Sequence, residues 1–279
     1  MLKYKQPTIG FMQGRLSPLV NGKIQAFPWD HWRDEFSIAN KHGFEIMEWT
    51  LDQDELYENP LMTKDGQIEI RELSHKYEIS ISSLTGDCFM QAPFYKVMEK
   101  DRESLLEDLQ NIISACGLLK IEFIVFPLVD NGSLENSEQE KILLKGLALF
   151  EPDLRKYGIQ IIFESDFIPD RLKYFINQFS TENYGINYDI GNSAALGYNP
   201  TEEFEAYGHR ILNVHIKDRL LHGTTVPLGH GNADIPKVLK KLNAINYNGN
   251  YILQTARSAD ENHAGFLCQY RDQVLKWMV

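Results

Sequence analysis

The stretch KYGIQIIFESD, residues 156–166, contains the repeating unit of an α/β fold. A glycine follows a helix-like segment, a run of Ile and Phe follows the glycine, and acidic side chains follow the run. A glycine just past a helix adopts the left-handed conformation without steric cost. A short run rich in Ile and Phe is typical of a buried strand. The stretch therefore predicts a helix end, a turn at Gly158 and a strand ending near Glu164.

The same order recurs along the chain. A glycine stands shortly before six of the apolar runs, at Gly43, Gly117, Gly158, Gly185, Gly208 and Gly249. The runs are TIGFM (8–12), FEIMEW (44–49), ISISSLT (79–85), IEFIVFP (121–127), IQIIFE (159–164), GINYD (185–189), ILNVHIK (211–217) and NYILQ (250–254). Segments of helical period separate the runs, such as 101–117 and 137–157, and Pro152 should break the latter.

Strand and helix repeated eight times predict parallel strands that close into a barrel. We therefore expect one α/β domain, a (β/α)8 TIM barrel that spans residues 1–279. An open doubly wound sheet is the alternative, and it usually carries a G-x-G-x-x-G loop after its first strand. The chain reads MQGRLSP at that place. Loop 14–29 contains Asn21-Gly22, a hairpin signal, and forms either a flap over the barrel mouth or a surface excursion.

Composition and charge narrow the classes of function. The net charge of −11 argues against nucleic acids and anionic membranes, both of which need a basic face. The three cysteines are widely spaced and form no CxxC pair, so neither a disulfide framework nor a zinc knuckle is indicated. The N-terminal MLKYKQP lacks a signal-peptide core, and no apolar run could span a membrane. We expect a cytoplasmic protein, and the oligomeric state stays open, with a homo-oligomer possible.

Polar side chains stand at the carboxyl ends of the predicted strands, where barrels of this kind place their working residues. The first half of the chain offers Gln13, Arg15, Glu48, Thr85, Asp87 and Asp130, and the second half offers Glu164, Asp189, His215 and Gln254. Any one such residue is more often solvated or a helix cap. The last four, however, end four consecutive strands and share oxygen or nitrogen donors. Together they predict a site for one divalent cation, Mn²⁺, Co²⁺, Mg²⁺ or Zn²⁺.

The phrases FE, YDIGN and VHIKD, followed by LGHGNADIPKVLKKL, resemble the xylose isomerase-like TIM-barrel superfamily of sugar-phosphate isomerases and epimerases. The resemblance covers essentially the whole chain and implies a small sugar or sugar phosphate as substrate. It implies a mononuclear metal site built from Glu164, Asp189, His215 and Gln254. By the same resemblance, Glu48, Asn192, Lys217 and Arg219 would hold substrate oxygens. Arg15 and Arg257 are further cationic candidates, although each also reads as an ion-pair partner at the rim.

Gln254 departs from the pattern of the resembled family, whose epimerases place a second glutamate there. One glutamate removes the proton beside the carbonyl, and the other returns it on the opposite face. A positioned acid or base contributes roughly 10²–10⁴-fold, and an amide cannot act as one. Three possibilities follow: Glu164 is the sole carboxylate base of an isomerase or a dehydratase; Lys217, Asp87 or His230 replaces the missing group; or the barrel binds a sugar without turning it over.

Single motifs bear on two further possibilities, a phosphate site and a nuclease. The segment PLGHGNADIP could bind phosphate through the N–H groups of Gly229 and Gly231, although Asp234 reads more simply as a helix N-cap. A three-zinc nuclease of the same superfamily would need extra histidines, and the chain has Glu48, Thr85, Asp87 and Asn192 at those places. We therefore expect a metal-dependent sugar isomerase or epimerase with Glu164 as base.

Overall fold

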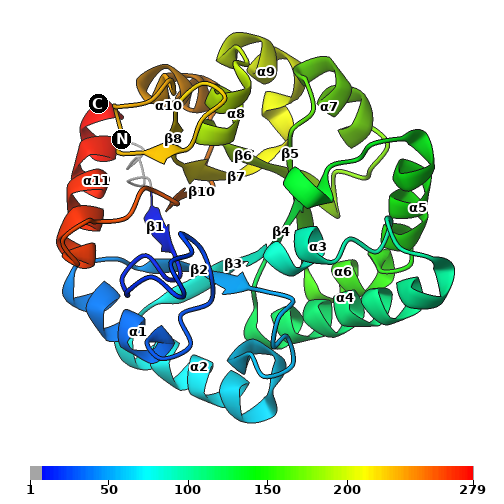
Figure 1. The fold of residues 1–279 in the computed structure, drawn as a ribbon, viewed down its shortest axis with the longest axis horizontal. Helices are drawn as coiled ribbons and strands as arrows, with labels where there is room; N and C mark the ends of the chain where they lie inside the picture. Colours follow the sequence, from blue (N-terminus) through cyan, green and yellow to red (C-terminus); the bar gives the residue numbers. More distant parts are fainter. Residues whose placement is uncertain (1–7, 279) are drawn as a thin grey trace, which may run out of the picture.

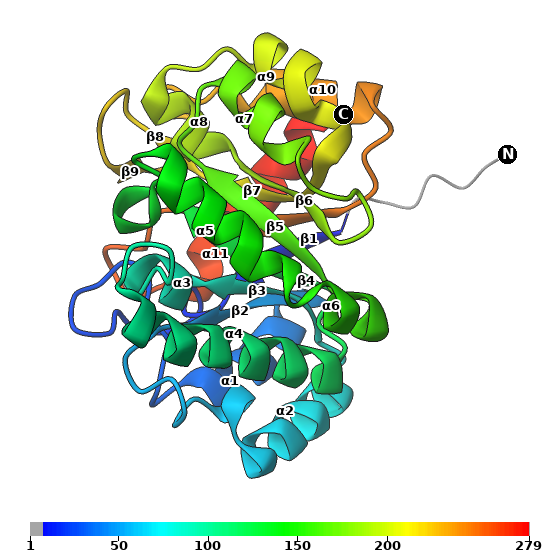
Figure 2. The same ribbon diagram turned by 90° about the vertical axis from the view of Figure 1, so that its right-hand side faces the viewer.

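A computed structural model, which describes residues 8–278, contains a closed barrel of eight parallel strands enclosed by helices (Figures 1 and 2). Around the barrel the strand order is β1-β10-β7-β6-β5-β4-β3-β2. This confirms the predicted (β/α)8 TIM barrel, and each of the eight apolar runs contributes one strand. The strands are β1 (Ile9–Met12), β2 (Ile46–Leu51), β3 (Ser80–Gly86), β4 (Phe123–Leu128), β5 (Gln160–Ser165), β6 (Tyr184–Asp189), β7 (Ile211–Ile216) and β10 (Asn250–Leu253).

The helices form the outer layer, and a small antiparallel pair, β8 (Asp218–Arg219) with β9 (Thr225–Val226), follows β7. Within the described residues, no helix is long and apolar enough to cross a membrane. The N-terminal MLKYKQP lies outside the described residues. The helices are α1 (Trp32–Lys41), α2 (Lys64–Tyr77), α3 (Asp87–Gln91), α4 (Glu99–Leu119), α5 (Ser137–Ala148), α6 (Glu151–Tyr157), α7 (Pro169–Ile176), α8 (Ile190–Leu196), α9 (Pro200–Tyr207), α10 (Ile235–Ala244) and α11 (His263–Trp277).

The left-handed conformation predicted for the six recurring glycines is present at two of them and absent at the other four, although Gly208 does stand at the end of α9. Gly43 and Gly158 have positive φ angles of 71° and 68°. Gly117 lies inside α4, where an added Cβ would stand 2.4 Å from the ring of Tyr157. Gly185 lies inside β6 under the side chain of Leu212. These glycines permit close packing between elements, which a sequence pattern does not distinguish from a turn. Pro152 does break the helical segment, because it lies in the first turn of α6.

Loop 14–29 is a hairpin whose two ends are packed against the barrel. Val20 pairs with Lys23 across Asn21-Gly22, as predicted from the dipeptide. The start of the loop is held by Glu35, whose carboxylate accepts hydrogen bonds from the backbone of Gly14 and Leu16 at 2.8 and 2.9 Å. Its end is held by the buried ring of Phe27 (1% exposed), which contacts the aromatic side chains below it. The loop is therefore a fixed flap at the mouth, with an exposed tip.

Two different layers of side chains surround the strands. Outside, aromatic and aliphatic groups fill the space under the helices, and Trp49 lies 5.7 Å from Trp32 and 5.4 Å from Phe27 between ring centroids. Inside, alternate residues of four strands are buried and polar, which follows from the two-residue period of a strand. These inward pairs are Glu48 and Thr50, Ser83 and Thr85, Asn187 and Asp189, and Asn213 and His215. The inward polar side chains of these four strands therefore lie beneath the mouth of the barrel and can hold the side chains there in place.

Replacing Trp49 by alanine should remove the centre of the aromatic cluster under loop 14–29. The side chain is fully buried, and truncation of such an aromatic group costs about 3–5 kcal/mol in the free energy of unfolding. Urea unfolding followed by far-UV circular dichroism measures the loss. Leu118→Ala is the control, because Leu118 is 57% exposed in α4 and should change stability little. Equal effects from the two variants would contradict this account of the core.

Candidate metal centre

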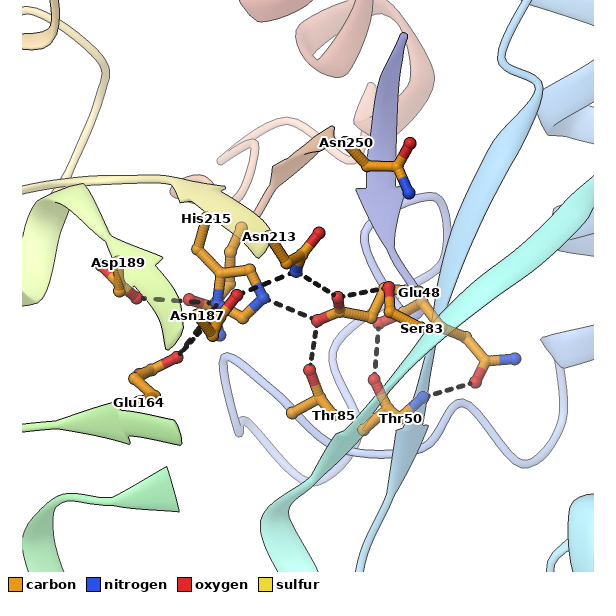
Figure 3. A network of polar contacts seen from close by, with 12 residues as sticks. Glu48, Thr50, Ser83, Thr85, Glu164, Asn187, Asp189, Asn213, His215 and Asn250 are labelled. Carbon is orange, nitrogen blue, oxygen red and sulfur yellow. Dashed lines mark hydrogen bonds and ion pairs between the residues drawn. The ribbon is translucent and has the colours of Figure 1, made fainter. Parts of the chain in front are cut away.

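His215 lies at the centre of a cluster of carboxylates contributed by neighbouring strands (Figure 3). Its Nδ1 atom is 3.1 Å from Glu164 Oε2 and 3.9 Å from Asp189 Oδ2. Glu164 lies near the end of β5, Asp189 ends β6, and His215 lies near the end of β7. One donor atom from each of the three lies within 4.8 Å of the others. The structure therefore brings together the three residues that the sequence predicted to share an ion.

The other ring nitrogen of His215 faces away from this cluster, towards Glu48. The Nε2 atom lies 2.7 Å from Glu48 Oε1, and both side chains are fully buried (Figure 3). An acceptor at Nε2 fixes the ring proton there when the imidazole is neutral, which leaves the Nδ1 lone pair facing Glu164 and Asp189. A carboxylate behind a histidine is the usual way in which proteins orient a metal-ligating imidazole. Glu48 thus lies beneath the histidine, in the middle of β2 rather than at its end.

A shell of polar side chains holds both partners of this pair in place. Glu48 accepts hydrogen bonds from Ser83 at 2.6 Å and from Asn213 at 3.0 Å, and another from Thr85. Burial alone would raise the pKa of Glu48, but the charge of His215 and these hydrogen bonds lower it. Burial lowers the pKa of His215, whereas Glu48 and Glu164 raise it to about 10. The surroundings of the ring therefore favour positive charge between these carboxylates.

Asp189 provides the observation that tests whether a cation fits. Among residues 8–278, its buried Oδ2 atom has no hydrogen-bond partner of good geometry, and Lys217 Nζ is an ion-pair partner 2.6 Å away. A buried carboxylate oxygen without a hydrogen bond is costly unless a cation compensates it. Asp189 Oδ1 is occupied, because it accepts the backbone N–H of Asn192 and caps α8. With His215 neutral, its Nδ1 atom, Asp189 Oδ2 and the carboxylate of Glu164 form a mixed N/O donor set that suits a divalent cation.

Gln254, the fourth predicted ligand, follows β10 directly and is 8% exposed. Its Oε1 atom accepts a hydrogen bond from Lys217 Nζ at 2.9 Å. Its Nε2 atom donates to Gln25 Oε1, also at 2.9 Å. The amide oxygen therefore lies beside the cluster, since Lys217 contacts both this oxygen and Asp189. The amide nitrogen is turned towards loop 14–29.

The structure divides the predicted substrate contacts into two groups. Asn192 and Arg219 extend the cluster, because Asn192 donates to Glu164 Oε1 at 2.6 Å and accepts from Arg219 at 2.8 Å. Arg15 and Arg257 bond to the backbone instead, and Arg15 also donates to Gln25 Oε1 at 3.3 Å. Arg15 donates to the carbonyl groups of Thr255 and Ile24, and Arg257 donates to those of Gly14 and Ser17. Both guanidinium groups connect the segment after β10 to loop 14–29.

The phosphate site considered after the seventh strand is wrong. The backbone N–H groups of Gly229 and Gly231 both donate to Asp218 Oδ2 at 2.9 Å, so a buried carboxylate of the chain takes the place of an external anion. Asp234 caps α10 as expected, accepting the backbone N–H of Lys237. An internal acid at this loop could not be distinguished from a ligand anion by the glycines alone. His230, offered as a replacement base, is exposed.

Several residues of the cluster were not found from the sequence. Asn187 donates to Glu164 Oε2 at 2.8 Å and lies 3.0 Å from His215 Nδ1, and Asn213 links Asn187 to Glu48. The signal for both was present, because each stands two positions before a predicted ligand and therefore points into the barrel as that ligand does. Gln25 had no such signal, since it lies in a loop far away along the chain.

Comparison with known proteins identifies the family of this barrel. Residues 36–269 match the model of the xylose isomerase-like TIM barrel family. The chain belongs to this family. A Haemophilus influenzae protein provisionally named L-ribulose-5-phosphate 3-epimerase is 23% identical over 262 residues, which cover 89% of this chain and 90% of that protein.

Two solved structures have a similar fold. The IOLI protein with a bound zinc atom superposes with a TM-score of 0.75 at 18% identity, covering 98% of this chain and 99% of the other. A D-tagatose 3-epimerase-like protein superposes with a TM-score of 0.72 at 21% identity, covering 97% and 98%. Both structures share the barrel fold of this chain, and the IOLI structure holds a zinc atom.

Metal affinity should depend on Glu48 as well as on the residues facing the cluster. We expect Mn²⁺ or Zn²⁺ to bind the wild-type protein in isothermal titration and His215→Gln to abolish binding. Glu48→Gln should weaken binding about 10–100-fold, because a neutral amide replaces the carboxylate that orients the ring. Glu203→Gln is the matched control: Glu203 is equally buried but accepts from Tyr188, Ser193 and Tyr207. Unchanged affinity in Glu48→Gln, or equal losses in both variants, would contradict this role.

Proposed function

We propose that the protein is a divalent-metal-dependent isomerase or epimerase of a small sugar or sugar phosphate. The reaction begins with removal of a proton from the carbon beside a carbonyl group. The observation that carries this proposal is the position of Glu164. Its carboxylate lies at the barrel mouth, one oxygen facing His215 and the other bonded to Asn192.

The donor set fits one divalent ion held by Glu164, Asp189 and His215, with the amide oxygen of Gln254 as a fourth candidate. Mn²⁺, Co²⁺, Mg²⁺ and Zn²⁺ all accept such oxygen and nitrogen ligands. When bound, the ion supplies polarisation of the sugar carbonyl and stabilisation of enediolate charge. The zinc in the structurally similar IOLI protein supports the presence of an ion in this fold.

The residues of the chain supply the base and the orientation. Burial alone would raise the pKa of Glu164, but His215, Lys217 and Asn187 lower it, so the group stays ionised and able to accept a proton. Lys217, Asn192 and Arg219 are the proposed contacts for sugar oxygens, because they line the same cluster with half-buried polar ends. We assign Glu48 to the support of His215, and Arg15 and Arg257 to the support of loop 14–29.

The names of the relatives support an epimerase over the two alternatives. The Haemophilus influenzae protein is named for L-ribulose 5-phosphate, and the similar structure for D-tagatose. A dehydratase would use the same base to begin loss of water, and a binding protein would keep the cluster without proton transfer. Exchange of substrate hydrogen with solvent separates the binding protein from both enzymes, and product analysis separates the enzymes.

Glu164→Gln should abolish proton transfer while leaving the fold intact. We expect the wild-type protein with Mn²⁺ to exchange the hydrogen beside the carbonyl of L-ribulose 5-phosphate or D-tagatose in D₂O, followed by proton NMR. The variant should exchange about 10²–10⁴-fold more slowly, because it lacks the positioned base.

The exposed Glu138→Gln in α5 serves as the control and should exchange at the wild-type rate. Undiminished exchange in Glu164→Gln would refute Glu164 as the base. A wild-type protein that binds these ketoses without exchange would instead be a binding protein.

A further inference from the structure

The amide at position 254 leaves open which group serves the second face of the substrate. Two-face epimerisation needs one group to remove a proton and another to return it from the opposite side. Gln254 can do neither. The identity of this second group rests on the proposed function, because only a two-face reaction needs it.

A continuous chain of polar contacts runs from Gln254 to a carboxylate on the other side of the mouth. Gln254 Nε2 donates to Gln25 Oε1 at 2.9 Å, and Gln25 Nε2 donates to Asp87 Oδ2 at 2.9 Å. At its other end, Gln254 Oε1 accepts from Lys217 Nζ, which lies beside Asp189. Asp87 is thus connected to the candidate metal centre through two side-chain amides, one of them carried by loop 14–29.

The direction of these hydrogen bonds fits an amide at position 254. The amide of Gln25 has one donating end and one accepting end. Its donating end is used by the carboxylate of Asp87, and its accepting end takes hydrogen bonds from Gln254 Nε2 at 2.9 Å and from Arg15 at 3.3 Å. A glutamate there would set oxygen against oxygen at one end of Gln25. This series of polar contacts therefore contains one carboxylate, that of Asp87, and position 254 carries an amide.

Asp87 approaches the cluster from the half of the barrel that carries no predicted ligand. The candidate ligands come from β5, β6, β7 and β10, which are consecutive around the barrel, whereas Asp87 directly follows β3. Burial raises the pKa of Asp87 to about 7, and repulsion from Asp52 and Glu164 adds to the shift, against the opposing effects of Gln25 and Lys217. Its carboxyl group is therefore able to hold a proton or release one near neutral pH.

The other two candidates are placed less well for this task. His230 is exposed in the loop after β9. Lys217 is engaged by Asp189 and Gln254 together, which makes it an orienting group. Asp87 has one hydrogen-bond donor, Gln25, on Oδ2. Its Oδ1 atom is free of such a partner among the described residues.

We propose that Asp87 is the second proton-transfer group of this site and that Gln25 positions it. Glu164 removes the proton as the C–H bond breaks, and the electron pair moves to the carbonyl oxygen to give an enediolate. Protonated Asp87 then gives its proton to the opposite face of the same carbon, and the carbonyl re-forms. Glu164 ends protonated and Asp87 ionised, and exchange of protons with water restores both groups. In the reverse direction the two groups exchange roles.

Asp87→Asn should separate the two halves of the reaction. The probe is whichever of L-ribulose 5-phosphate and D-tagatose the wild-type protein with Mn²⁺ exchanges faster in D₂O. We expect the variant to keep exchange with retention of configuration, because Glu164 is intact. Inversion of configuration, measured by chromatography of the epimeric products, should fall about 10²–10⁴-fold.

A second variant tests the link through Gln25. In Asp87→Asn combined with Gln254→Glu, the carboxylate moves to the other end of the same chain, and a rotated Gln25 amide again has a donor and an acceptor in the right order. We expect this double variant to invert the substrate about tenfold faster than Asp87→Asn alone. A purely structural role for Asp87 predicts that the double variant is no faster than Asp87→Asn. That result would overturn the link through Gln25.

Asp108→Asn is the matched control, because Asp108 is a buried carboxylate in α4 that accepts from Gln53 and Tyr57 and has no contact with Gln25 or Asp87 among the described residues. It should invert the substrate at the wild-type rate. Wild-type inversion by Asp87→Asn, or a wild-type protein that exchanges hydrogen without ever inverting, would overturn the proposal. Absence of any exchange by the wild-type protein would refute the proposed function itself, so the two failures are distinguishable.

Discussion

The contact between Glu48 and His215 is the interaction on which the candidate site depends. It fixes the ring so that Nδ1 faces Glu164 and Asp189, and it does so from inside the barrel where no solvent competes. A buried carboxylate is tolerated there only because Ser83, Thr85 and Asn213 donate to it. The polar interior of this barrel is therefore the support of its mouth, and a wholly apolar interior could not hold the histidine in this orientation.

The cost of burying a carboxylate without compensation also explains the arrangement of charge around the mouth. Glu164 and Asp189 are kept close together by positive groups between and beside them, namely His215 and Lys217. Asp87 stands apart from this set and is joined to it by the neutral amides of Gln25 and Gln254. The separation allows one carboxylate to stay ionised while burial raises the pKa of another. Two carboxyl groups with different proton affinities are what a two-face reaction requires.

Most of the fold was predictable because the period of apolar residues and the count of strand-helix units are local properties of the chain. The eight strands follow the apolar runs within a few residues, and Glu164, Asp189 and His215 could be found because barrel strands place their ends at one mouth. The inward position of Glu48 was not found, since the strand continues to Leu51 and no local signal marks its end. The glycines misled at Gly117 and Gly185, where the need for glycine comes from a neighbouring element.

The sequence by itself determined the barrel and the three residues that share one mouth, because both depend on order and spacing along the chain. Only the tertiary structure decided what each polar group faces. Asp218 occupies the N–H groups that looked available to phosphate, and Gln25 reaches from a distant loop to join Gln254 with Asp87. Hydrogen-bond partners far apart in sequence are selected by the closed geometry of the barrel, which brings loop 14–29 over the ends of β3 and β10.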